Sequence, residues 1–139
     1  MNALCEAVKV AGPLGGRILL ALLFLISGYH KVGGFSQVAA AMAGKGIPLP
    51  EVALIVTILV EIGGGLMLIA GWKARWAAAA LFLWLIPVTA LFHNFWAADA
   101  AQYQNQFNHF LKNLCIMGGM LYIMAFGAGP LSIDQRRKS

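Results

Sequence analysis

Charged side chains are scarce in this sequence. Asp, Glu, Lys and Arg together account for 11% of its 139 residues, and 60% of the residues are hydrophobic, whereas an average soluble domain is about 25% charged. A soluble domain of roughly this size still exposes about a third of its unfolded-chain surface, so it could not hide so many apolar side chains from water. The composition therefore argues against a soluble enzyme and a disordered tail, and indicates that a lipid bilayer is the solvent.

Cysteine is scarce as well. Cys5 and Cys115 lie far apart in the sequence, and no C-x-x-C motif occurs. A thiol oxidoreductase needs an attacking and a resolving thiol close together, so this class is disfavoured together with a disulfide scaffold. The sequence also lacks tight histidine spacing such as H-x-x-x-H, which is typical of metal sites on helices. We therefore expect no metal site.

The sequence instead contains long apolar runs, and the length of each is close to the roughly 20 residues that a helix needs to cross a bilayer. They predict a single all-α membrane domain over residues 1–139, an integral membrane four-helix bundle. Residues 35–42 predict a short amphipathic helix in the first outer connection, and 127–139 form the expected cytoplasmic tail. The expected spans are about 13–32, 50–70, 75–93 and 109–126.

Basic residues are unevenly divided between the two sides of these spans. The expected outer side holds Lys31, Lys45 and Lys112. The other side holds both termini and seven basic residues, namely Lys9, Arg17, Lys73, Arg75, Arg136, Arg137 and Lys138. The positive-inside rule then places both termini in the cytoplasm, in a bacterial chain at the inner (plasma) membrane. The net charge of +5 is explained by basic residues at the ends of the spans, which orient the protein in the membrane, and we expect no nucleic-acid partner.

The two halves of the chain are weakly similar. Residues 17–25 and 75–83 place Arg, Phe and Leu alike, and a Gly-Gly pair recurs at 64–65 and 118–119. Two spans per half keep the same orientation, so the pattern favours a 2+2 parallel repeat. Chance similarity between apolar helices is the alternative.

Glu61 is the clearest functional candidate, because an ionisable residue inside a membrane span is costly. It lies eleven residues into the second span, about 16 Å below the outer edge at 1.5 Å per residue. Arg17, thirteen residues before His30, lies about 20 Å below that edge. We therefore expect a buried Arg17–Glu61 pair, which either fixes helix packing or tunes a proton-accepting carboxylate.

A second group of polar residues gathers where three spans reach the outer edge. Imidazole and ammonium groups donate protons and hydrogen bonds to carbonyl oxygens, so this group suits an anion or a quinone. Haem is disfavoured, because none of the histidines is paired at mid-depth. The group comprises His30, Lys31, His93, His109, Lys112 and Asn113.

An ordered set of short motifs resembles the DoxX family across about residues 13–134. The motifs are Gly16-Arg17, Gly28 with Lys31, Gly46-Ile47-Pro48, Glu61-Ile62-Gly63-Gly64 with Gly71 and Arg75, and Phe110-Leu111-Lys112-Asn113-Leu114 with Gly118-Gly119. The resemblance implies a four-helix bacterial inner-membrane protein, similar to the small membrane subunit of a thiosulfate:quinone oxidoreductase. On this basis the family's motif positions fall on Arg17, Lys31, Glu61, Lys112 and Asn113.

Our first functional hypothesis is a quinone-interacting membrane subunit of an oxidoreductase complex. Glu61 would relay protons at a catalytic site where Arg17 tunes its carboxylate, and the quinone or an anion would be held by Lys31, His93, Lys112 and Asn113. No cofactor motif occurs in the chain, so electrons would come from a partner redox subunit, and a homo-oligomer is the other expected assembly. The alternative is a non-enzymatic membrane scaffold or assembly factor for a redox or stress-response complex. A channel would require oligomerisation to form a pore, and whether the chain is an enzyme stays open.

Overall fold

The computed structural model describes residues 2–137, and almost all of this part of the chain is helical. Four of its helices are long and apolar enough to cross a membrane, so the predicted all-α four-helix membrane bundle is confirmed. In chain order the elements are α1 (Asn2–Gly33), α2 (Phe35–Gly44), α3 (Pro50–Ala70), α4 (Ala74–Phe92), the 3-10 helix η1 (Phe95–Ala97), α5 (Ala100–Phe126) and α6 (Ile133–Arg136).

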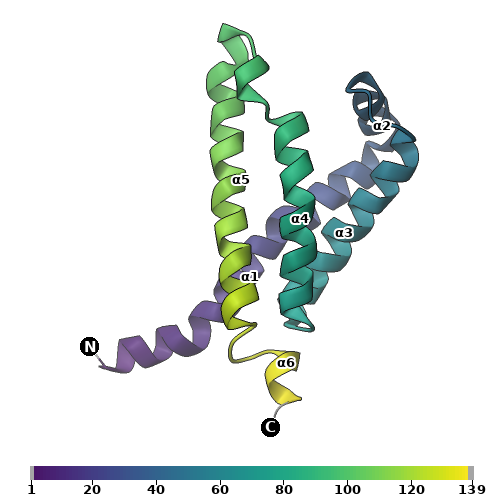
Figure 1. Ribbon diagram of the computed structural model, residues 1–139. Helices are drawn as coiled ribbons and strands as arrows, with labels where there is room; N and C mark the ends of the chain where they lie inside the picture. The colour runs from purple at the N-terminus through teal and green to yellow at the C-terminus, as the bar shows by residue number, and fades with distance from the viewer. Residues whose placement is uncertain (1, 138–139) are drawn as a thin grey trace.

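Two of the long helices extend well beyond the expected spans. α1 starts at Asn2 and runs through Pro13, and its first turns project from the bundle (Figure 1). α5 starts at Ala100 because Asp99 caps it, its carboxylate accepting a hydrogen bond from the Gln102 N–H at 2.9 Å. Such a cap satisfies an N–H group that would otherwise lack a partner. The helices therefore continue past the apolar segments from which the spans were predicted.

The bundle consists of two helix pairs joined through its centre. α1 packs on α3, α4 packs on α5, and the contact between α3 and α4 joins the pairs. Glycines on α3 let its neighbours approach closely. A Cβ atom on Gly64 would lie 2.9 Å from Leu81 Cγ on α4, and a Cβ atom on Gly65 would lie 2.9 Å from Leu25 on α1. Small residues serve this purpose in membrane bundles. Each pair corresponds to one half of the sequence in which the weak repeat was noted.

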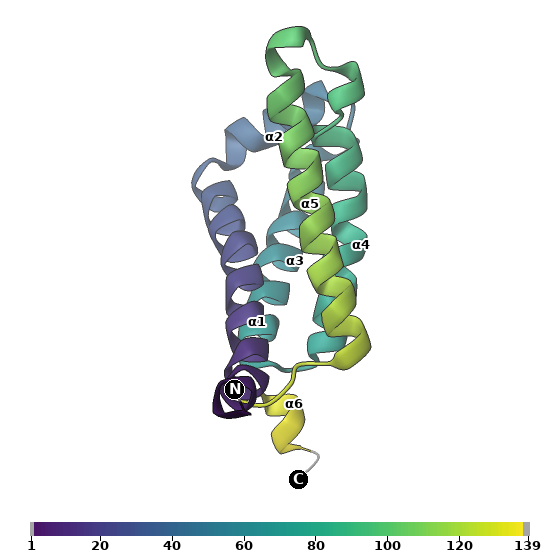
Figure 2. The ribbon, with the colours of Figure 1, turned by 90° about the vertical axis from the view of Figure 1, so that its left-hand side faces the viewer.

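Both termini lie at one end of the bundle, and α2 and η1 lie at the other (Figure 2). We call these the terminal end and the loop end. α2 covers the first turns of α3, where Ala39, Met42 and Leu54 form a small buried cluster. Because α2 occupies these turns, the end of α1 packs against α3 further toward the terminal end.

The segment after α5 folds back on the terminal end. The Asp134 carboxylate accepts hydrogen bonds from the backbone N–H groups of Lys73 (2.7 Å) and Ala74 (2.9 Å) at the start of α4. The Asp134 N–H in turn donates to the Gly71 carbonyl at 2.9 Å. As far as residue 137, the expected tail is thus an ordered part of the bundle that caps α4.

Candidate functional site

Arg17 does not pair with Glu61, so this part of the sequence prediction is wrong. The Arg17 side chain is buried, and its Nη1 donates to the carbonyl oxygens of Leu68 (3.1 Å) and Ile69 (3.4 Å) at the end of α3. Nη2 donates to Leu131 O at 2.9 Å. The guanidinium therefore fastens the C-terminus of α3 to the segment after α5, where the helix dipole favours a cation.

The reason lies in how α1 is placed along α3. Arg17 meets α3 about seven residues beyond Glu61, or about 10 Å at 1.5 Å per residue. The prediction measured depth from the ends of the two apolar runs as if these ends were level. In the structure α2 occupies the first turns of α3, so α1 packs further toward the terminal end than its sequence position suggests.

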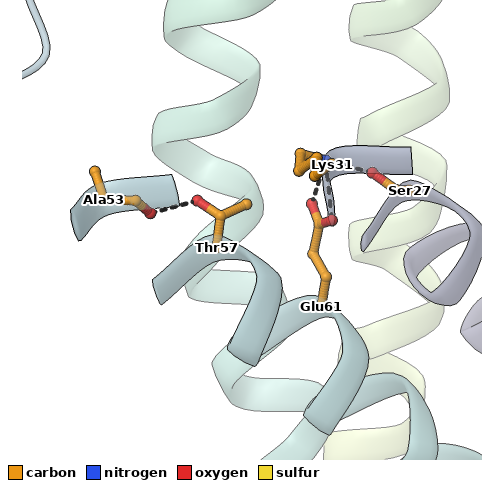
Figure 3. A network of polar contacts seen from close by, with 5 residues as sticks. All are labelled: Ser27, Lys31, Ala53, Thr57 and Glu61. Atoms are coloured by element: carbon orange, nitrogen blue, oxygen red, sulfur yellow. Dashed lines mark hydrogen bonds and ion pairs between the residues drawn. The ribbon is translucent and has the colours of Figure 1, made fainter. Parts of the chain in front are cut away.

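Lys31 takes the place of Arg17 as the partner of Glu61. Its ammonium lies 2.9 and 3.0 Å from the two carboxylate oxygens, and it also donates to Ser27 Oγ one turn earlier (Figure 3). The Glu61 side chain is 7% exposed and that of Lys31 24%. The predicted buried acid is therefore paired, and the lysine that was expected at the outer edge lies beside the middle of α3.

This ion pair forms part of the wall of a cavity of about 440 Å³ between the helices. The volume falls in the range of small-molecule sites, about 300–1,000 Å³. The remaining wall is mostly apolar, with Phe24, Met42, Leu85 and Phe92 among its residues. Five predicted site residues line this one cavity, namely Lys31, Glu61, His93, Lys112 and Asn113; Arg17 does not.

Trp84 supplies a polar group that sequence analysis missed. It lines the cavity from α4, and its indole nitrogen is buried without a hydrogen-bond partner among the described residues. A buried donor left unpaired costs about 1–3 kcal/mol, so a ligand oxygen that accepts from it would bind favourably. Tryptophan in an apolar run looks like any lipid-facing or core residue, and no sequence signal distinguished it.

The loop end of the cavity carries a chain of polar side chains. The rings of His93 and His109 are stacked with their centres 5.0 Å apart, and His109 Nδ1 lies 3.1 Å from Lys112 Nζ. His93 Nδ1 also lies 3.2 Å from Gln106 Oε1. The expected cluster of bases therefore forms from α4 and α5, whereas His30 is exposed on α1 and does not line the cavity.

Asn113 joins the two helices of the second pair. Its amide Nδ2 donates to Thr89 Oγ1 at 2.9 Å, and both side chains are buried. Thr57, on the α3 wall, uses its hydroxyl group internally, donating to Ala53 O at 2.7 Å. The bond between Asn113 and Thr89 therefore holds α4 and α5 together beside the cavity.

The arrangement is suited to binding a mainly apolar molecule that carries hydrogen-bond acceptors. The indole N–H of Trp84 and the Lys112 ammonium are donors, whereas the Lys31 ammonium already contacts Ser27 and both Glu61 oxygens. Within residues 2–137 no group of three or more His, Cys, Asp or Glu side chains could hold a metal ion.

The fold and the cavity define the class: a multi-pass helical membrane protein with a polar site between its spans. A family model described as DoxX matches residues 12–94, more than half of the chain. The chain belongs to the DoxX family.

Named relatives extend the likeness over most of the chain. Inner membrane protein YqjF of Escherichia coli (strain K12) is 33% identical over 130 residues, covering 94% of this chain and 95% of the relative. Inner membrane protein YphA of the same organism is 28% identical over 120 residues, covering 86% of each chain. Surfeit locus protein 4 homolog of Schizosaccharomyces pombe is 28% identical over 127 residues, covering 90% of this chain but 37% of that protein. No solved structure matches the chain significantly.

Proposed function

We propose that this protein is a quinone-interacting membrane subunit of an oxidoreductase complex and that the quinone head group binds in the cavity between the spans. It would lie in a bacterial inner membrane with both termini in the cytoplasm, as the positive-inside rule indicates and as the names of the two Escherichia coli relatives suggest.

One observation carries the proposal: the mostly apolar cavity is lined both by Trp84, whose buried N–H has no hydrogen-bond partner among residues 2–137, and by the Lys31–Glu61 ion pair. A quinone is a flat apolar ring with carbonyl acceptors, and the Trp84 N–H is a donor without a partner in the part of the chain that the structure describes. Leu23 and Leu91 line the cavity and are also exposed on the outside of the bundle. A lipid-soluble molecule could therefore reach the cavity from the bilayer.

Reduction of a quinone to its quinol takes up two electrons and two protons. In this proposal the electrons come from a separate redox subunit, because the chain holds no cofactor motif. Two proton-bearing groups on the wall are Lys31 Nζ, which the Glu61 carboxylate holds in place, and the imidazole of His93. Proton transfer by positioned side chains is typical of such chemistry.

A scaffold or assembly factor is the competing function, and one observation favours it. The Lys31 ammonium has three N–H groups, and it already contacts Ser27 and both Glu61 oxygens. A pair satisfied in this way could serve only to fix α1 against α3. In that case the cavity would have no quinone preference.

Thermal unfolding of the purified protein in mild detergent distinguishes the two functions. We expect a short-chain quinone to raise the unfolding temperature in a saturable manner, since a ligand that binds the folded state stabilises it. Trp84→Phe should weaken binding about three- to tenfold, the effect of one hydrogen bond of about 1 kcal/mol.

Trp76→Phe is the matched control, because Trp76 lies on the same helix but is 76% exposed outside this cavity. It should bind quinone as the wild type does. If quinones do not stabilise the folded wild type, or if both tryptophan variants lose binding equally, the quinone assignment fails and the scaffold function is favoured.

A further inference from the structure

A second hollow, of about 360 Å³, lies at the terminal end of the bundle. The start of α4, the end of α5 and the returning C-terminal segment enclose it. Its charged lining residues are Lys73, Arg75, Asp134 and Arg137. It shares no lining residue with the cavity between the spans, so it is argued independently of the proposed function.

The single acid in this lining leaves its cations without a carboxylate partner. Both Asp134 oxygens accept hydrogen bonds from backbone N–H groups at the start of α4. Within residues 2–137 the ion pairs are Lys9–Glu6 and Lys31–Glu61, so Lys73, Arg75 and Arg137 form none there. The hollow therefore presents a net positive charge.

A hydrogen bond to the end of α5 positions the guanidinium group of Arg75. Its Nη2 donates to Ala125 O at 3.2 Å, and its Nε lies 3.4 Å from where a Cβ atom on Gly127 would stand. The bare backbone at Gly127 thus admits the guanidinium close to the end of α5. A guanidinium fork is suited to binding phosphate oxygens in pairs.

Aromatic side chains adjoin these cations on the outer surface of α4 and α5. Trp76 is 76% exposed and Phe126 is 69% exposed, and both line the hollow. They lie at the ends of the membrane-spanning helices, where aromatic residues commonly mark the boundary between hydrocarbon and head groups. A cationic hollow beside an apolar rim matches the two parts of a phospholipid.

We propose that this hollow binds the phosphate head group of an anionic phospholipid in the leaflet on the terminal side. The cations of Lys73, Arg75 and Arg137 face the phosphate, and Trp76 and Phe126 lie along the first part of the acyl chains. Basic pockets between spans are known to hold such head groups. A free phosphate ion offers the same charge, but it leaves the aromatic rim unused.

Native mass spectrometry in detergent tests this site by titrating phosphatidylglycerol against phosphatidylcholine with the same acyl chains. We expect clear preference for the anionic lipid. Arg75→Gln with Arg137→Gln should weaken its binding about twenty-five-fold, at about fivefold for each cation removed. Lys9→Gln with Arg136→Gln removes the same charge from the same end without touching the lining, and should bind as the wild type does.

Arg137→Gln alone, expected to be about fivefold weaker, keeps the test valid if the double variant does not fold, because Arg137 is exposed near the end of the described chain. Equal binding of the two lipids, or equal loss in the lining and control variants, would overturn the proposal. Displacement of the lipid by millimolar inorganic phosphate would also overturn it, since the hollow would then be a phosphate site and not a lipid site.

Discussion

Replacing Lys31 by methionine removes the cation that faces Glu61 and leaves its position filled by an apolar side chain of similar length. The Glu61 carboxylate is 7% exposed, so after the replacement it must either stay buried without a counter-charge or take up a proton. Glu61→Met is the reciprocal change, and the double variant Lys31→Met with Glu61→Met removes both charges together.

The size of each effect follows from burial. Removing one partner of a buried pair costs about 3–5 kcal/mol, but Lys31 is one-quarter exposed and water screens the interaction in part. We therefore expect about 2–3 kcal/mol for Lys31→Met and about 1–2 kcal/mol for Glu61→Met, where the ammonium keeps its contact with Ser27. The double variant should lie within about 1 kcal/mol of the wild type, because apolar replacement of a whole pair is often neutral.

The free energy of unfolding can be measured in mixed micelles by titrating a denaturing detergent and following helicity by circular dichroism. A double-mutant cycle from the four proteins should give a coupling energy of about 3–5 kcal/mol, the sum of the two single losses less the small loss of the double variant. If the double variant instead loses the sum of the two single losses, Lys31 and Glu61 do not interact, and the pairing in Figure 3 is refuted.

Three further predictions concern the contacts that hold the bundle together, each measured by the same unfolding assay. Arg17→Met should cost about 3 kcal/mol, because four backbone carbonyls lose their donor; a loss below about 1 kcal/mol would contradict this. Gly71→Ala should cost at least about 3 kcal/mol, since Gly71 has φ 62° and its Cβ would overlap Arg17 Nη1 and Ser132; wild-type stability would refute it. Thr89→Val should cost about 1–2 kcal/mol by leaving the Asn113 amide unpaired, and Asn113→Leu added to it should restore part of that loss.

The helical framework follows from the sequence because bilayer thickness fixes how long an apolar run must be. α2 and α3 begin where their patterns predict, at Phe35 and Pro50. The first turns of α5 are rich in Gln and Asn, and those of α1 carry Glu6 and Lys9, so the spans predicted from uninterrupted apolar runs began later than the helices. The start of α5 depends on its local cap, Asp99.

The site could be predicted only in part. Glu61, Lys112 and Asn113 were found because polar residues are conspicuous in apolar spans. The partner of Glu61 was not predicted, because it depends on the position of α1 along α3, and that position is set by the packing of α2. Ser27 lies one turn before Lys31 and could have been found from that spacing, whereas nothing in the sequence distinguished Trp84.

The central claim is that a quinone occupies the cavity between the spans, and photolabelling with an azido-quinone followed by peptide mapping tests it most directly. We predict that the label falls on the cavity-lining stretches 23–31 of α1 and 84–92 of α4, and that excess unlabelled quinone and Trp84→Phe both suppress it. Label spread over lipid-facing positions such as Leu59 and Leu121, unaffected by competing quinone, would contradict the account.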